Sequence, residues 1–302
     1  MDSNVRYLAE EVAENCADGH LNRREAMRQL SFLGFSTVAA SALLAACGSD
    51  DDESASSQGS TTPPTTVSSG PTTTGPPLAT ENITWQGNGI TMMGVYAKAA
   101  SPKGAVLVIH ENRGITDFVR TMTGKLAASG YTALAVDLLS AQGGTAALPD
   151  QAQLQSALTQ NASTRSTEDM KSALIELGKR APGLKQAAIG FCFGGNMTWQ
   201  LLAAGDPPPL TAGVPYYGQL TGDDLSKTKA AVMSVYAELD TRVNANREAA
   251  TSAMEKARLV HQVKTYPGVQ HAFMNNTGAN YNQQQADAAY ADMMAWFGTH
   301  LR

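Results

Sequence analysis

The chain has 302 residues, 43% of them hydrophobic, so it is long enough to bury a sizeable core in one large domain or two small ones. Lys and Arg total 22 against 27 Asp and Glu, and no basic stripe is visible, which argues against nucleic acid as a partner. The three cysteines, Cys16, Cys47 and Cys192, share no metal-ligand spacing, so no metal site is expected.

Residues 1–47 have the pattern of an export signal. Arg23 and Arg24 precede an uncharged stretch, residues 29–46, that is rich in Leu, Ala, Phe, Ser and Gly. This stretch is shorter and less apolar than a membrane span of about 20 residues requires. The arginine pair is typical of a twin-arginine signal, and the sequence Leu-Ala-Ala-Cys-Gly around Cys47 resembles a lipoprotein processing site.

The segment that follows, residues 48–80, consists mainly of Ser, Thr, Gly, Pro and acidic residues. Such a composition cannot bury enough apolar surface to fold, so we expect a disordered tether. A lipid on Cys47 would then hold the protein at a membrane, in the periplasm or at the cell surface. Two alternatives are cleavage between residues 39 and 46, which releases a soluble protein, and an amphipathic helix at the start of a cytoplasmic protein.

Residues 81–302 predict a single α/β domain. The expected strands are 90–97, 105–109, 132–136, 187–191, 212–217, 231–236 and 260–266, and the expected helices are 117–129, 149–160, 165–180, 194–204, 245–257 and 281–300. Four consecutive apolar residues end the second strand, as in a strand buried on both faces of a parallel sheet. The alternation of strands and helices predicts a mostly parallel sheet with helices on both faces.

The most specific motif is Gly-Phe-Cys-Phe-Gly-Gly at residues 190–195, between a predicted strand and a predicted helix. It has the form of the nucleophile elbow of α/β hydrolases, with Cys192 in place of serine. The tight turn strains the nucleophile and requires glycines where a side chain would collide. The helix that follows would lower the thiol pKa and offer backbone N–H groups to an oxyanion. The alternative is a buried structural cysteine.

Candidate partners of the thiol follow later strands, in the order that α/β hydrolases use. Asp240 follows the strand at 231–236, and His271 follows the strand at 260–266. We expect His271 to exchange protons with Cys192 and the leaving group, and Asp240 to orient the imidazole. Taken singly, Asp240 could be a loop cap and His271 a surface residue.

A fourth group of candidates follows the buried strand at 105–109. Glu111 could take the thiol proton, cap a helix or form a salt bridge. In α/β hydrolases this loop supplies the second oxyanion N–H, so Asn112 and Phe193 are the candidate backbone donors.

Together these residues resemble the dienelactone hydrolase (carboxymethylenebutenolidase-like) family of α/β hydrolases. The matching pieces are residues 110–114 (His-Glu-Asn-Arg-Gly), 130–131 (Gly-Tyr), 136–139 (Val-Asp-Leu-Leu), 190–195, 216–218 (Tyr-Tyr-Gly), Asp240 and 271–273 (His-Ala-Phe). The resemblance implies a triad of Cys192, Asp240 and His271, a thiol-deprotonating role for Glu111, and no cofactor or metal.

Two substrate-binding arginines of the dienelactone-cleaving members have no counterpart here. Their neighbourhoods read Ser-Ala-Gln at 140–142 and Met-Asn-Asn at 274–276. The resemblance therefore implies a hydrolase of small esters or lactones without specifying dienelactone, and Arg113 or Arg242 could meet an anionic substrate. Other hypotheses are an exported small-molecule-binding lipoprotein and a thiol redox enzyme, which lacks a second cysteine in the processed chain. The sequence does not indicate an oligomeric state.

Overall fold

The computed structural model describes residues 3–17, 19–45, 75–148, 150–161, 163–205, 208–222 and 224–302. Cys47, the candidate lipidation site, and most of the expected tether lie outside these residues. Among the residues described, no helix has the length and apolar character needed to cross a membrane.

The core of the fold is an eight-stranded sheet with the strand order β1-β2-β4-β3-β5-β6-β7-β8. The strands are β1 (Glu81–Gly87), β2 (Ile90–Ala97), β3 (Gly104–Ile109), β4 (Tyr131–Asp137), β5 (Gln186–Phe191), β6 (Ala212–Tyr216), β7 (Ala231–Ala237) and β8 (His261–Tyr266). β2 runs antiparallel to β1 and β4, and the other pairs are parallel. Every residue of β3 is buried, as predicted for a strand covered on both faces, and the same holds for β4, β6 and β7.

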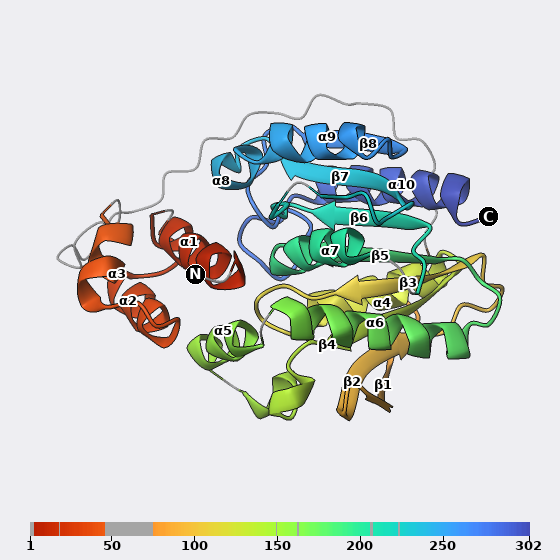
Figure 1. The fold of residues 1–302 in the computed structure, drawn as a ribbon, viewed down its shortest axis with the longest axis horizontal. Coiled ribbons are helices and arrows are strands. Elements are labelled where there is room, and N and C mark those ends of the chain that lie inside the picture. The colour runs from red at the N-terminus through yellow and green to blue at the C-terminus, as the bar shows by residue number, and fades with distance from the viewer. Residues whose placement is uncertain are drawn as a thin grey trace.

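Helices cover both faces of this sheet, so the predicted α/β class is confirmed (Figure 1). They are α4 (Asp117–Ala128), α5 (Gln151–Gln160), α6 (Ser163–Arg180), α7 (Phe193–Ala204), α8 (Thr241–Asn244), α9 (Arg247–Lys256) and α10 (Gln283–His300), with short 3-10 turns at Ser140–Gln142 and Thr145–Ala147. In Figure 1, α6 and α7 lie in front of the sheet, with α4 and α10 behind it.

Two elements differ from the sequence-based expectation. β1 was not predicted, because it is an edge strand with mostly exposed side chains and little apolar alternation. The helix expected at 245–257 is preceded by a separate short helix, α8, and begins only at Arg247. The Asp240 carboxylate caps α8 by accepting a hydrogen bond from the Val243 N–H at 3.0 Å.

In the described part of the first 44 residues, three helices pack beside the domain. They are α1 (Ser3–Ala17), α2 (Arg23–Phe32) and α3 (Thr37–Leu43), drawn in red and orange in Figure 1. The apolar stretch expected as the centre of an export signal forms the end of α2 and all of α3, and in it Leu30, Ala40 and the C-cap residue Leu44 are fully buried. Arg28 of α2 also pairs with Asp150, the cap of α5, at 2.9 Å.

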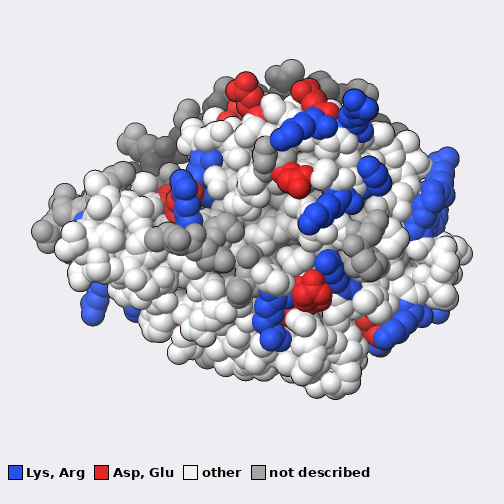
Figure 2. Space-filling model, in the orientation of Figure 1, with Lys and Arg blue, Asp and Glu red and all other residues white. Residues whose placement is uncertain are grey.

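Lys and Arg side chains alternate with Asp and Glu over the described part of the face in Figure 2. No stripe of one sign crosses it. The pattern agrees with the mixed charge of the sequence.

Candidate active site

Cys192 occupies a strained turn between β5 and α7. Its φ is 56° and its ψ is −118°, in a region that side-chain-bearing residues rarely adopt. Its N–H donates to Tyr216 O at 3.1 Å, and its carbonyl accepts from the Gly195 N–H at 2.8 Å. The backbone on both sides therefore fixes the direction of the thiol.

The glycines of the elbow are required by close backbone approaches. A Cβ on Gly190 would lie 2.0 Å from Gly194 O, and a Cβ on Gly194 would lie 2.3 Å from Ile109 O. A Cβ on Gly195 would lie 2.4 Å from Tyr216 O. These contacts are the collisions that the motif predicts for residues next to a tight nucleophile turn.

Asp240 and His271 meet beyond the ends of β7 and β8. His271 Nδ1 lies 2.5 Å from Asp240 Oδ2, and the Asp240 side chain is fully buried. Burial lowers the pKa of His271, but the adjacent Asp240 carboxylate outweighs it and leaves that pKa above its ordinary value. Burial likewise raises the pKa of Asp240, yet the neighbouring His271 and Arg242 bring it below the usual range.

The other imidazole nitrogen is buried, and the ring lies close to the thiol. His271 Nε2 is buried without a hydrogen-bond partner among the described residues. A nitrogen of this ring, the Cys192 sulfur and a Glu11 oxygen all lie within 4.8 Å of one another. Cys192, His271 and Asp240 are thus brought together in the order that the sequence predicts.

Glu111 is a buried carboxyl at the wall of the same site. Its Oε2 accepts a hydrogen bond from Asn275 Nδ2 at 2.6 Å, and its Oε1 is buried without a partner among the described residues. Burial, reinforced by the nearby Glu11, raises the pKa of Glu111 to about 7. A carboxyl with that pKa can accept or release a proton near neutral pH. Among the described residues, Glu111 caps no helix and forms no salt bridge.

His110 holds the loop that carries Glu111. It is fully buried, with Nδ1 2.6 Å from Glu111 O, and its Nε2 accepts a hydrogen bond from the Leu138 N–H at 3.1 Å. The ring therefore ties the loop after β3 to the loop after β4 and serves a structural purpose.

The two predicted oxyanion donors belong to two segments that border the site, the start of α7 and the loop after β3. Phe193 is the first residue of α7, where backbone N–H groups have no partner within the helix. Asn112 lies in the β3–α4 loop and lines the same cleft as Cys192. Its side-chain amide donates to Glu11 Oε1 at 2.5 Å.

The two candidate arginines are placed differently. Arg113 is exposed at the edge of the cleft. The Arg242 side chain is only 11% exposed, and its Nε lies 2.7 Å from Glu14 Oε2 of α1. Arg242 also stacks over the Tyr7 ring, with 4.6 Å between its Cζ and the ring centroid.

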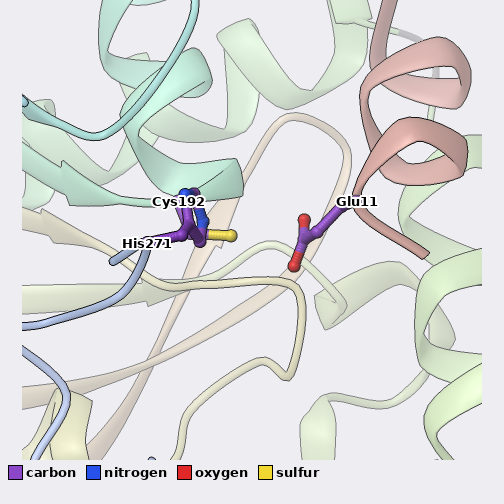
Figure 3. Close-up of side chains that lie close together, drawn as sticks. All are labelled: Glu11, Cys192 and His271. Atoms are coloured by element: carbon purple, nitrogen blue, oxygen red, sulfur yellow. The ribbon is translucent and has the colours of Figure 1, made fainter. Parts of the chain in front are cut away.

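The cleft over Cys192 is about 310 Å³ and is closed on one side by α1. From the domain it is lined by Glu111, Cys192 and His271, and from α1 by Glu11 and Glu14. Figure 3 shows the Glu11 carboxylate extending from α1 toward the Cys192 sulfur. These N-terminal residues were not predicted as part of the site.

This setting stabilises the neutral thiol. Cys192 is 3% exposed, and burial raises its thiol pKa well above the ordinary value. The carboxylates of Glu11 and Glu111 raise it further, against the opposing charge of Arg242. Glu11, Cys192 and His271 also have the chemistry and spacing to ligate a metal ion, but such an ion would block both the thiol and the imidazole.

Comparison with known proteins agrees with this geometry. Residues 92–301 match the Dienelactone hydrolase family. The chain belongs to this family. The "Putative carboxymethylenebutenolidase" of Saccharolobus solfataricus is 26% identical over 249 residues, which cover 70% of this chain and 95% of that protein. The protein of the same name from Salmonella typhi is 28% identical over 229 residues, covering 70% and 84%.

A solved structure extends the similarity to three dimensions. The crystal structure of "Putative Dienelactone Hydrolase from Klebsiella pneumoniae" has a TM-score of 0.65 and 25% sequence identity, and the match covers 73% of this chain and 99% of that one. The predicted α/β-hydrolase fold is confirmed. As a member of the dienelactone hydrolase family, the protein is a hydrolase of carboxylic esters or lactones.

Proposed function

We propose that this dienelactone hydrolase-family protein cleaves small esters or lactones through an acyl-enzyme formed on Cys192. The observation that carries the proposal is the strained elbow cysteine beside an imidazole hydrogen-bonded to a buried carboxylate. In such sites the thiolate is the nucleophile, and the carboxylate keeps the imidazole in the productive orientation.

In the proposed reaction, Glu111 takes the Cys192 proton, and the thiolate sulfur bonds to the carbonyl carbon. The carbonyl oxygen becomes an oxyanion, which the Phe193 and Asn112 N–H groups stabilise. When the carbonyl re-forms, the C–O bond breaks, and protonated His271 gives its proton to the leaving alkoxide. The products of this half are a thioester and an alcohol.

In the second half, neutral His271 takes a proton from water as the water oxygen bonds to the thioester carbon. The C–S bond then breaks, the carboxylic acid leaves, and the Cys192 thiolate recovers its proton from Glu111. The net reaction adds one water across the ester. Two properties support these roles, namely the pKa of Glu111, raised to about 7, and that of His271, raised above its ordinary value.

For the start of the chain we propose export by a twin-arginine-type signal, with lipidation of Cys47 and a periplasmic or cell-surface location. The order of Arg23 and Arg24, the apolar stretch and the small residues before Cys47 supports it. Replacing both arginines by lysine should retain the unprocessed chain in the cytoplasm of a bacterium with a twin-arginine pathway. Replacing Cys47 by alanine should remove a lipid label without preventing export.

The catalytic proposal is tested with Cys192→Ala. The smaller side chain keeps the fold, so the melting temperature should stay within a few degrees of the value with Cys192, while hydrolysis of a panel of p-nitrophenyl esters by a chain beginning at residue 75, which leaves the cleft free of α1, should fall by about a thousandfold or more. A folded Cys192→Ala protein with full esterase activity would refute it. Binding of esters without turnover by the chain that begins at residue 75 and keeps Cys192 would instead favour a binding protein on the same fold.

A further inference from the structure

We infer that α1 is an internal inhibitor, an acidic helix for which the mouth of the active site forms the docking surface. While residues 3–17 are docked, Cys192 is closed to substrate and to solvent reagents. This inference goes beyond the proposed hydrolysis and requires only that Cys192 be the reactive thiol.

The first support is direct contact between α1 and the thiol. The Tyr7 hydroxyl donates to the Cys192 sulfur at 3.7 Å, and Tyr7 is 1% exposed. One turn further along the helix, a Glu11 oxygen lies within 4.8 Å of the sulfur and of a His271 nitrogen (Figure 3). An ester carbonyl must enter this space to reach the sulfur, so substrate and α1 cannot occupy the site together.

The second support is a charged anchor. Glu14 pairs with Arg242 at 2.7 Å, and a Glu14 oxygen also lies within 4.8 Å of Asp240 and His271 ligand atoms. The Arg242 terminal nitrogens are buried without a hydrogen-bond partner among the described residues. With α1 docked, the charge of Arg242 is therefore met by a carboxylate of the helix, and by the Tyr7 ring packed against it.

The third support is apolar packing on the same helix. Leu8 and Val12 are completely buried, and Asn4 accepts a hydrogen bond from Gln200 of α7 at 2.8 Å. Residues 4, 7, 8, 11 and 12 repeat at helical spacing on one buried face, while Arg6 remains exposed. An export signal that is recognised in an extended conformation and then removed would not require a helix face that packs into the catalytic cleft.

α1 lies on the N-terminal side of the proposed processing site, so processing would affect its contact with the active site. α1 precedes Cys47, so cleavage at the proposed processing site would cut the peptide link between this helix and the hydrolase domain. The uncleaved chain would then be a closed form, and release of α1 after cleavage would open the site. The hydrolase domain alone corresponds to a whole protein in relatives, since the match spans 99% of the Klebsiella structure.

The test measures access to the thiol without requiring turnover. The full chain is treated with iodoacetamide, and mass spectrometry follows modification of the peptide that contains Cys192. The double variant Leu8→Ala, Val12→Ala should react at least about 10-fold faster than wild type, because it loses buried contacts that hold α1. Val38→Ala, an apolar truncation at a residue of α3 that is 82% exposed, should react at the wild-type rate.

A second pair of substitutions removes only a charge and is therefore less disruptive to folding. Glu14→Gln removes the charge that faces Arg242 and should accelerate modification several-fold, whereas Glu10→Gln, whose carboxylate pairs with the exposed Arg6, should not. A chain beginning at residue 75 gives the rate of the open site. Equal rates in this short chain, the wild type and all the variants would overturn the inference.

Ester hydrolysis by the same proteins separates this inference from the proposed function. If the short chain is alkylated faster but hydrolyses no ester, α1 is an inhibitor of access and the hydrolytic proposal fails. If the full and short chains hydrolyse esters and react with iodoacetamide equally well, the hydrolytic proposal stands and the inhibitor is excluded.

Discussion

Asn275 and Glu111, 164 positions apart, form a buried hydrogen bond in which Asn275 Nδ2 donates to Glu111 Oε2 at 2.6 Å. The bond leaves Glu111 Oε1 buried without a described partner. Glu111 is thereby fixed in direction while one oxygen remains available for a proton. The arrangement suits a carboxyl that takes part in proton transfer.

The raised pKa of Glu111 predicts a pH-dependent cost to stability. Between pH 4.5, its ordinary pKa, and about 7, the folded protein retains a proton that the unfolded chain has released. The free energy of unfolding therefore falls as pH rises through this window. Glu111→Gln should remove the effect and stabilise the protein by up to about 3 kcal/mol at pH 8, with no gain at pH 4.

Urea unfolding of both proteins at pH 4, 6 and 8 measures this difference. Gln retains an oxygen that can accept from Asn275, so the hydrogen bond is a constant in the comparison. A gain of equal size at all three pH values would show that packing, and not the charge of Glu111, is responsible. Esterase activity should fall in the same variant, because the thiol proton loses its acceptor.

Asp240→Asn should separate the orienting and capping roles of this side chain. Asn can still accept from the Val243 N–H and so keep the cap of α8, but it carries no charge to stabilise protonated His271. The pKa of His271 should fall below its ordinary value, because burial, together with the charge of Arg242, then outweighs the nearby Glu11 carboxylate. We expect kcat/KM to decrease by roughly a thousandfold to ten-thousandfold.

Titration of the His271 ring by NMR, assigned with a His271→Gln variant, checks the pKa directly. Thermal unfolding of Asp240→Asn serves as the control for the cap. A His271 pKa that stays above its ordinary value in Asp240→Asn would mean that another group, and not this carboxylate, stabilises the protonated ring.

The two arginines make a further pair of predictions about substrate charge. Once α1 is removed, Arg242 loses the Glu14 carboxylate and can bind an anionic group, whereas Arg113 is already exposed at the edge of the cleft. In a chain beginning at residue 75, Arg242→Gln should raise KM for a p-nitrophenyl ester that carries a carboxylate by about 10-fold relative to a neutral ester. Arg113→Gln should change that ratio less than about twofold.

Steady-state kinetics on the matched neutral and anionic esters decide between them. A larger effect of Arg113→Gln would transfer the anion-binding role to the cleft edge. No effect of either variant on the ratio would indicate that substrates of this enzyme are recognised without a cation.

Local motifs account for the parts of the site that were predicted from sequence. The elbow is encoded within six residues, and the parallel strand order then brings the segments after β7 and β8 to the same edge, where Asp240 and His271 meet. Glu111 was found in the same way, because its loop follows the central strand β3.

The contacts that were not predicted join distant segments through single side chains. An asparagine such as Asn275 carries no motif that would connect it to Glu111. For α1, the available signal was the helical spacing of Tyr7, Leu8, Glu11 and Val12 ahead of the arginine pair. An export pattern follows this helix and its docking partner lies more than a hundred residues later, so the spacing alone does not specify what α1 packs against.

The elbow also makes a quantitative prediction about stability. A Cβ on Gly190 would lie 2.0 Å from Gly194 O, a backbone atom that cannot move without displacing α7. Gly190→Ala should therefore lower the free energy of unfolding by at least about 2–3 kcal/mol.

Gly298→Ala, on the helix α10, is the matched control. Its new Cβ would lie 4.0 Å from the nearest described atom, the Arg302 Nη2. Alanine favours a helix over glycine, so this variant should gain about 0.5–1 kcal/mol in the same urea titration. Similar free energies for the two variants would mean that the turn around Cys192 can relax, and that its strained φ is not imposed by the packing of β5 against α7.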